Sequence, residues 1–241
     1  MSEYQIPILL YHRIVNEKSQ IGKHKIYVWE KSFREQMKFL KENGYETITF
    51  NEIEKESSAK KIILTFDDGY EDNYAILFPI LKEFGFTSVI YLVTKQTRNE
   101  WAIKEGEPEL KMMTKEMIRE MSDYGIEFGG HTRTHADLKK TPKEKFTDEI
   151  AGCKKDIEEV VGKPTLSFAY PFGAHKEETL QAVRDAGYKY GITTIFGPAK
   201  WQDDLMRIRR IEVRPKDGLS RFKFKASGYY FQKSYLQNIF S

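Results

Sequence analysis

Short runs of apolar and β-branched residues alternate along the chain with longer segments in which apolar residues recur every three or four positions. The short runs predict buried strands at residues 7–12, 61–66, 88–93, 126–130, 166–170, 188–194 and 208–213. The longer segments predict helices at 32–43, 72–84, 114–124, 141–162 and 177–186, and the tail after Gly218 also reads as helical. The fourth of these helices is expected to open with a capping box, Thr141-Pro142-Lys143-Glu144.

Strands that alternate with helices throughout a chain pair in parallel through helical crossovers. About seven such units in one domain favour a closed β/α barrel over an open, doubly wound sheet. A barrel predicts where the candidate catalytic residues lie, because the active sites of β/α barrels are at the carboxyl ends of the strands.

Composition adds bounds to this picture. The 241 residues are 40% hydrophobic and 14% aromatic, which suffices for a core and excludes disorder across the whole chain. No linker or repeat divides the sequence, so residues 1–241 are expected to form one domain. The formal charge of +3, from 39 basic and 36 acidic residues, gives no reason to expect binding to nucleic acid or to an anionic membrane. A single cysteine, Cys153, rules out an intrachain disulfide.

No targeting segment is evident at the start of the sequence. The apolar run at residues 6–11 is too short for a signal peptide or a membrane span. We therefore expect a cytoplasmic location for the sequence as written, and a secreted or cell-surface one if it is a piece of a longer chain.

Two carboxylates, Asp67 and Asp68, follow the strand at 61–66 directly. Adjacent residues on a strand point to opposite faces, so both can serve one site only where the strand ends and the backbone turns. Gly69 can supply that turn. The alternative is a polar loop in which one aspartate caps the next helix.

Two histidines, His131 and His135, follow another predicted strand. A separation of four in a turn or a helix places both imidazoles on one side, where they can share a metal ion or simply lie on the surface. With Asp68 they would offer two nitrogens and one oxygen, an open site with room for water and substrate. Iron oxygenases also use such a triad, but the β/α alternation favours a hydrolytic metal site.

Two further segments end predicted strands. In Phe168-Ala169-Tyr170-Pro171-Phe172-Gly173, the amide of Phe172 is a natural donor to an oxyanion, since Pro171 has no N–H. The same aromatic residues could instead close the mouth of the barrel. His12 ends the first strand and is either structural or catalytic. Four candidate segments thus fall at strand ends, as a barrel requires.

These motifs resemble those of the polysaccharide deacetylases, the NodB-homology carbohydrate esterases of family 4. The resemblance rests on Thr65-Phe66-Asp67-Asp68-Gly69, on the His131/His135 pair and on the stretch from Phe168 to Gly173. It runs from about residue 7 to 213 and leaves an aromatic-rich extension at 214–241. It implies a distorted (β/α)7 barrel, a divalent metal ion that is most often zinc, and removal of N-acetyl groups from amino sugars.

Carried over residue by residue, the resemblance makes Asp67 the general base and makes Asp68, His131 and His135 the metal ligands. The Phe172 amide becomes an oxyanion donor. The sequence departs from the family where Ala169 stands in place of the usual arginine, whose charge Arg210 could restore from another strand.

The second departure is the lack of a late histidine, because no histidine follows His175. The branch of the family that deacetylates poly-N-acetylglucosamine takes its acid from an N-terminal Tyr-His motif, which matches Tyr11-His12. We therefore predict that His12 is the general acid.

The predicted substrate is an N-acetylated glycan, with Tyr70, Tyr170, Trp201 and Arg210 as candidate contacts. Two alternatives stay open: a related hydrolase that cleaves a C–N bond of a small amide, and a catalytically silent glycan-binding barrel. The sequence does not indicate an oligomeric state.

Overall fold

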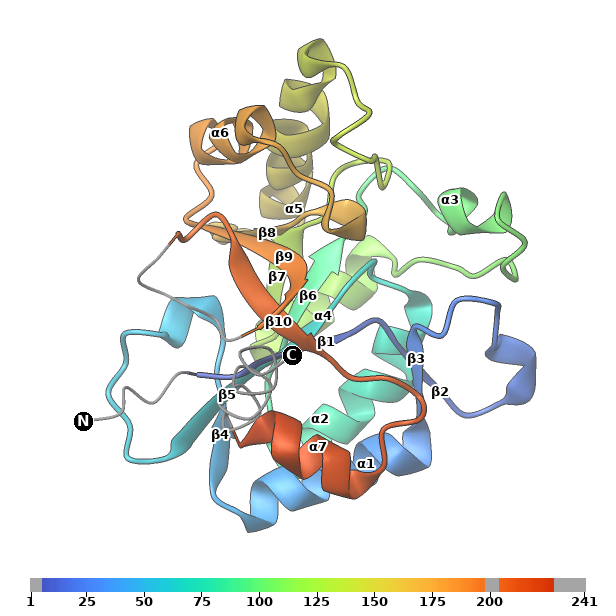
Figure 1. The fold of residues 1–241 in the computed structure, drawn as a ribbon, viewed down its shortest axis with the longest axis vertical. Helices are drawn as coiled ribbons and strands as arrows, with labels where there is room; N and C mark the ends of the chain where they lie inside the picture. The colour runs from blue at the N-terminus through green and yellow to red at the C-terminus, as the bar shows by residue number, and fades with distance from the viewer. Residues whose placement is uncertain (1–5, 198–203, 228–241) are drawn as a thin grey trace, which may run out of the picture.

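The computed structural model describes residues 6–197 and 204–227. Within these ranges, seven parallel strands close into a barrel (Figure 1). They are β1 (Ile8–Tyr11), β5 (Lys60–Phe66), β6 (Val89–Leu92), β7 (Glu127–Gly130), β8 (Ser167–Ala169), β9 (Tyr190–Phe196) and β10 (Ile208–Glu212). The strands run in the order β1-β10-β9-β8-β7-β6-β5, and pairing of β1 with β5 closes the ring. The prediction of a seven-stranded β/α barrel is confirmed.

Helices cover the outside of the barrel. They are α1 (Glu30–Glu42), α2 (Phe78–Phe84), α4 (Lys115–Tyr124), α5 (Cys153–Val161), α6 (Glu177–Asp185) and α7 (Leu219–Ala226), with the short α3 (Glu100–Ile103) in an insertion after β6. Two π-helical segments, η3 (Asn73–Leu77) and η5 (Thr147–Gly152), precede α2 and α5. Four 3-10 segments complete the helical elements: η1 (Lys18–Gln20), η2 (Phe50–Glu52), η4 (Lys143–Lys145) and η6 (Pro171–Gly173).

Each predicted strand and helix has a counterpart in the structure, with boundaries displaced by a few residues. Thr114 caps the α4 helix, because its hydroxyl accepts a hydrogen bond from the amide of Met117. The capping box expected at Thr141 is wrong. The hydroxyl of Thr141 donates to the carbonyl of Asp137 instead, and the helical segment opens at Lys143 as a 3-10 turn.

Three short strands escaped prediction. β2 (Arg13–Val15) and β3 (Tyr27–Trp29) form a separate parallel pair, and β4 (Tyr45–Thr47) adds to β5 outside the closed ring. A strand of three residues is too short to show a period of two in the sequence.

Alternation along the strands divides the core into two layers, as expected for a small barrel. Ile8, Ile63 and Val89 belong to one apolar cluster that joins the strands. Their neighbours Leu64 and Ile90 belong to a second cluster, which the covering helices share. Helix α7 packs against α1, where the rings of Phe222 and Phe39 lie 6.1 Å apart.

The register brings the strand ends together. Tyr11 of β1 pairs with Phe66 of β5, and Gly130 of β7 pairs with Phe168 of β8. The residues that follow these strands therefore share the carboxyl end of the barrel, where a β/α barrel carries its chemistry. In the described ranges, we find no helix with the length and apolar character of a membrane span.

Candidate active site

Asp68, His131 and His135 converge at the carboxyl end of the barrel. Their potential ligand atoms all lie within 4.8 Å of one another, and all three side chains are buried. The Oδ1 atom of Asp68 lies 3.4 Å from Nε2 of His131 and 3.3 Å from Nε2 of His135. Metal bonds of about 2.1 Å hold neighbouring ligand atoms roughly 3.0 to 3.4 Å apart. The spacing thus fits a shared divalent ion.

The chemistry of the donors agrees with this spacing. Oδ1 of Asp68 is buried and has no hydrogen-bond partner among the described residues, a costly state that a bound cation would relieve. Burial alone would raise the pKa of Asp68, but contact with His131 and His135 holds that pKa well below its usual range. The carboxylate is therefore ionised and ready to ligate.

His131 has a second contact that fixes its ring. Nδ1 donates to the carbonyl oxygen of Ala169 over 2.7 Å, which leaves the lone pair of Nε2 facing Asp68. A ligating histidine is commonly oriented in this way by an acceptor behind it. Ala169 stands where the family usually has an arginine, so this position serves the site through its backbone.

His135 is held by aromatic packing. The Trp101 ring stacks on its imidazole at 4.4 Å and 17°, and the Phe172 ring meets it edge-on at 4.6 Å. Trp101 comes from α3, in the insertion after β6. Sequence reasoning did not place it at the metal centre, because nothing in its local pattern indicates where a loop of the barrel mouth folds back.

Backbone conformation shapes the two ligand loops. Asp68 and His135 both adopt positive φ, at 77° and 60°, which is uncommon for residues other than glycine. Gly69 follows at φ 82°, and a side chain there would come within 2.6 Å of Leu92. The turn that Gly69 was predicted to supply is therefore present.

The neighbouring carboxylate, Asp67, is buried and paired with Arg210 of β10. Nη1 of Arg210 lies 2.6 Å from Oδ1 of Asp67 and Nη2 lies 2.7 Å from Oδ2. Burial alone would raise the pKa of Asp67, but the charge and hydrogen bonds of Arg210 lower it. The Asp67 carboxylate is therefore ionised at neutral pH, and it lies directly before Asp68 of the triad.

Arg210 is itself fixed inside the barrel. Its Nε donates to the carbonyl of Thr193, and Nη1 also donates to the hydroxyl of Thr65. The guanidinium carbon lies 5.6 Å from the centre of the Tyr91 ring. The side chain of Arg210 is fully buried and pairs with Asp67, so it brings a positive charge to this carboxylate from another strand and has no exposed surface.

His12 follows β1 at the same end of the barrel and is partly exposed. Its backbone carbonyl accepts a hydrogen bond from the side chain of Asn73. Next to it, Arg13 pairs with the buried Asp72 over 2.7 Å. His12 also contributes, after larger effects, to the lowered pKa of Asp67. These contacts hold the backbone of His12 near Asp67, whose amide donates to the carbonyl of Tyr11.

Phe172 has an unusual conformation for its position. It adopts φ 58° within η6, and 56% of its surface is exposed. The next residue, Gly173, packs so closely that a side chain there would come within 2.1 Å of the Thr194 hydroxyl oxygen. The turn is tight, and it brings the exposed ring of Phe172 against His135.

The structure describes two of the other three residues that were predicted to contact the substrate, and both are buried. Tyr170 is fully buried, and its hydroxyl donates to the carbonyl of Met206, so it packs in the core rather than facing a substrate. Tyr70 is also buried, between Trp101 and the guanidinium of Arg13, and lacks an open face for a sugar ring. Trp201 lies outside the described residues.

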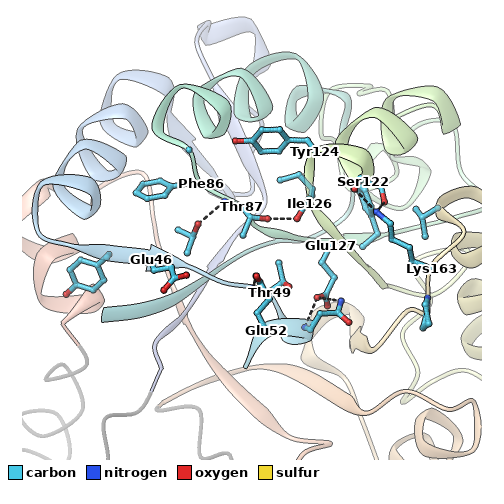
Figure 2. A pocket seen from close by; sticks show the side chains of 18 of the residues that line it. Glu46, Thr49, Glu52, Phe86, Thr87, Ser122, Tyr124, Ile126, Glu127 and Lys163 are labelled. Carbon is cyan, nitrogen blue, oxygen red and sulfur yellow. Dashed lines mark hydrogen bonds between the residues drawn. The ribbon is translucent and has the colours of Figure 1, made fainter. Parts of the chain in front are cut away.

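A separate cavity of about 690 Å³ lies at the opposite end of the barrel (Figure 2). The buried Glu127, at the start of β7, accepts hydrogen bonds there from the amide and the side chain of Asn51. Lys163 donates to the carbonyl and hydroxyl of Ser122. These contacts tie loops to the amino ends of the strands, where residues of β/α barrels serve stability.

Comparison with known proteins now identifies the family. The family model described as polysaccharide deacetylase matches residues 54–191, which include both aspartates and both histidines of the site. The chain belongs to the polysaccharide deacetylase family. This deacetylase is 32% identical over 228 residues to the putative polysaccharide deacetylase YxkH of Bacillus subtilis, covering 92% of this chain and 75% of that one.

A second curated relative and a solved structure are also similar to this chain. The poly-beta-1,6-N-acetyl-D-glucosamine N-deacetylase of Staphylococcus epidermidis is 27% identical, over 77% of this chain and 68% of its own. The solved structure of the Streptococcus pyogenes deacetylase PplD in complex with acetate superposes with a TM-score of 0.81 at 28% identity. That match covers 92% of the deacetylase described here and 98% of PplD. The predicted fold and enzyme class are confirmed.

Proposed function

We propose that this deacetylase hydrolyses the N-acetyl groups of N-acetylhexosamine units in a poly- or oligosaccharide. The observation that carries the proposal is the ionised Asp67, paired with Arg210, directly beside a triad that fits a divalent ion. A relative that is named a poly-N-acetylglucosamine deacetylase supports the choice of an amino sugar.

Asp67 is the proposed general base. Arg210 occupies both carboxylate oxygens, so it fixes the plane of the group and keeps it ionised. Proton uptake from a water requires that the base be ionised beforehand. A silent glycan-binding barrel has no need for a buried, paired carboxylate beside an intact triad, which argues against that alternative.

Asp68, His131 and His135 are the proposed ligands, with zinc as the ion. Two imidazole nitrogens and one carboxylate oxygen are a donor set typical of catalytic zinc sites, which keep a position open for water. When bound there, the ion supplies Lewis-acid polarisation of the amide carbonyl and acidifies a water.

His12 and Phe172 complete the proposal. Cleavage of an amide leaves an amine that must be protonated, and His12, which follows β1 near Asp67, is partly exposed. The Phe172 amide is the proposed donor to the tetrahedral oxyanion. Its exposed ring, next to His135, provides an apolar surface beside the reacting group.

Acetate release tests the function. We expect release from β-linked N-acetylglucosamine oligomers, its loss on treatment with a chelator, and recovery on addition of zinc. A parallel panel of small linear and cyclic amides separates the two hydrolase readings, because turnover of an amide without turnover of any acetylated sugar would favour the small-molecule alternative. Binding of oligomers with no chelator-sensitive release would favour the silent barrel.

A further inference from the structure

The loop that carries both histidines has a backbone that needs external support. Between His131 and His135 it turns sharply, with positive φ at Thr132 (64°) and again at His135 (60°). Such conformations disfavour residues with a side chain, and they persist where surrounding contacts hold them. The loop is also not a helix, so its amides lack the partners that a helix would supply.

Glu149, which belongs to none of the motifs above, supplies those partners. Its Oε2 atom accepts hydrogen bonds from the backbone amides of Arg133 (2.9 Å) and Thr134 (3.0 Å). Its Oε1 atom accepts one from the hydroxyl of Thr134 (2.7 Å). The side chain is buried, so the loop and the carboxylate satisfy each other away from water.

The helical segment around Glu149 holds the loop at a second point. The Arg133 guanidinium donates from Nε and Nη2 to the two carboxylate oxygens of Asp156, at 2.8 Å each. From the other side, the amide of Lys95 donates to the carbonyl of Arg133 over 2.8 Å. The loop is thus fixed between the end of β6 and the helical segment from η5 to α5.

The position of Glu149 follows from an irregularity in that segment. It lies in η5, a π-helical stretch with one residue more per hydrogen-bonded turn than an α-helix. Such stretches are frequent at functional sites. An extra residue rotates the side chains that follow, so the register of η5 decides whether Glu149 faces the loop.

We propose that Glu149 is a positioning residue that preorganises the His131–His135 loop for metal binding. It is not one of the three side chains that could hold the ion. It acts by holding Arg133 and Thr134, two of the three residues between the ligands, in the conformation that aims both imidazoles at Asp68. This inference rests on the metal site of the proposed function.

Zinc affinity is the measurement that tests this role. We expect Glu149→Ala to weaken zinc binding about tenfold or more, measured by competition with a chromogenic chelator, since contacts behind a ligand commonly contribute that much. Glu149→Gln should lie between Ala and wild type, because its carbonyl oxygen can still accept one hydrogen bond. At saturating zinc, the kcat of both variants should recover towards that of wild type.

Glu159→Gln is the matched control, since Glu159 lies on α5 with an exposed side chain and pairs with Lys155 on the same helix. It should leave zinc affinity unchanged. Melting of the metal-free proteins separates positioning from folding. Lower thermal stability of the Glu149 variants with wild-type zinc affinity would overturn the proposal.

If Glu149→Ala does not fold, the zinc affinity of Glu149→Gln tests the proposal instead. A folded Glu149→Gln variant with the zinc affinity of wild type would overturn the proposal. These titrations contain no substrate. A wild-type protein that binds zinc but releases no acetate would contradict the proposed reaction, while the comparison of affinities would still decide the role of Glu149.

Discussion

The Nη1 and Nη2 atoms of Arg210, on β10, contact the two carboxylate oxygens of Asp67 at 2.6 and 2.7 Å. Ala169 ends β8, which is separated from β10 by β9. The charge that the family usually places at the position of Ala169 therefore reaches the base from another strand. Both side chains are buried, so each depends on the other for compensation of its charge.

Removal of that partner should affect both stability and rate. Arg210→Met leaves the Asp67 carboxylate buried without compensation, and we expect a loss of about 3–5 kcal/mol in the free energy of unfolding. Arg210→Lys keeps the charge but not the two-point geometry, so it should retain more stability than activity. Denaturant unfolding and acetate release measure the two effects, and wild-type rates in both variants would refute the orienting role.

Replacement of the proposed acid should slow the reaction without loss of the ion. We expect His12→Ala to lower kcat about 10²- to 10⁴-fold, the usual contribution of a general acid, with zinc affinity close to wild type. His24→Ala is the matched control, since that histidine pairs with Glu105 on the surface. A near-normal rate in His12→Ala would remove His12 from the mechanism.

Trp101 should report on the metal site. Because its ring stacks on His135 at 4.4 Å, zinc binding is expected to change tryptophan fluorescence in the wild type. Trp101→Phe should abolish most of that change while a ring still packs on the imidazole. An unchanged signal in Trp101→Phe would mean that the response comes from another tryptophan.

Asp72 should give the unfolding free energy a distinct pH dependence. Burial raises its pKa to about 6 in the folded protein, although the paired Arg13 opposes the shift. Near pH 5 the folded chain thus holds more of this proton than the unfolded chain, whose aspartates titrate near about 3.9. This group therefore makes stability fall as pH rises from about 4 to about 6, with little further change above.

Asp72→Asn should remove that component of the slope. The measurement is the free energy of unfolding of both proteins at several pH values between 4 and 7. The wild type should lose stability relative to the variant as pH rises through this window. Parallel curves would show that the pKa of Asp72 does not change on folding.

Much of the site could be predicted because most of its residues belong to short sequence motifs that directly follow strands. The alternation of strands with helices predicted the barrel, and the barrel places everything that follows its strands at one end. We could therefore predict, without knowledge of side-chain packing, that four residues meet there: Asp67, Asp68, His131 and His135.

Other parts of the site depend on contacts between distant segments. The acceptor behind His131 is a backbone carbonyl, that of Ala169, which any residue type could provide. Glu149 contacts the histidine loop from η5, a π-helical segment that the apolar period does not reveal. Tyr170 follows a strand as a site residue would, yet its side chain is buried in an apolar cluster with Phe168 and Leu180.

The most direct test of this account is to compare Asp67→Asn with Asp68→Asn in two assays, acetate release and zinc binding. Asp67→Asn should abolish release and still bind zinc, because the ligands remain and the base is lost. Asp68→Asn should lose zinc affinity together with activity. Loss of zinc in Asp67→Asn with retention in Asp68→Asn would contradict the assignment and exchange the roles of the two carboxylates.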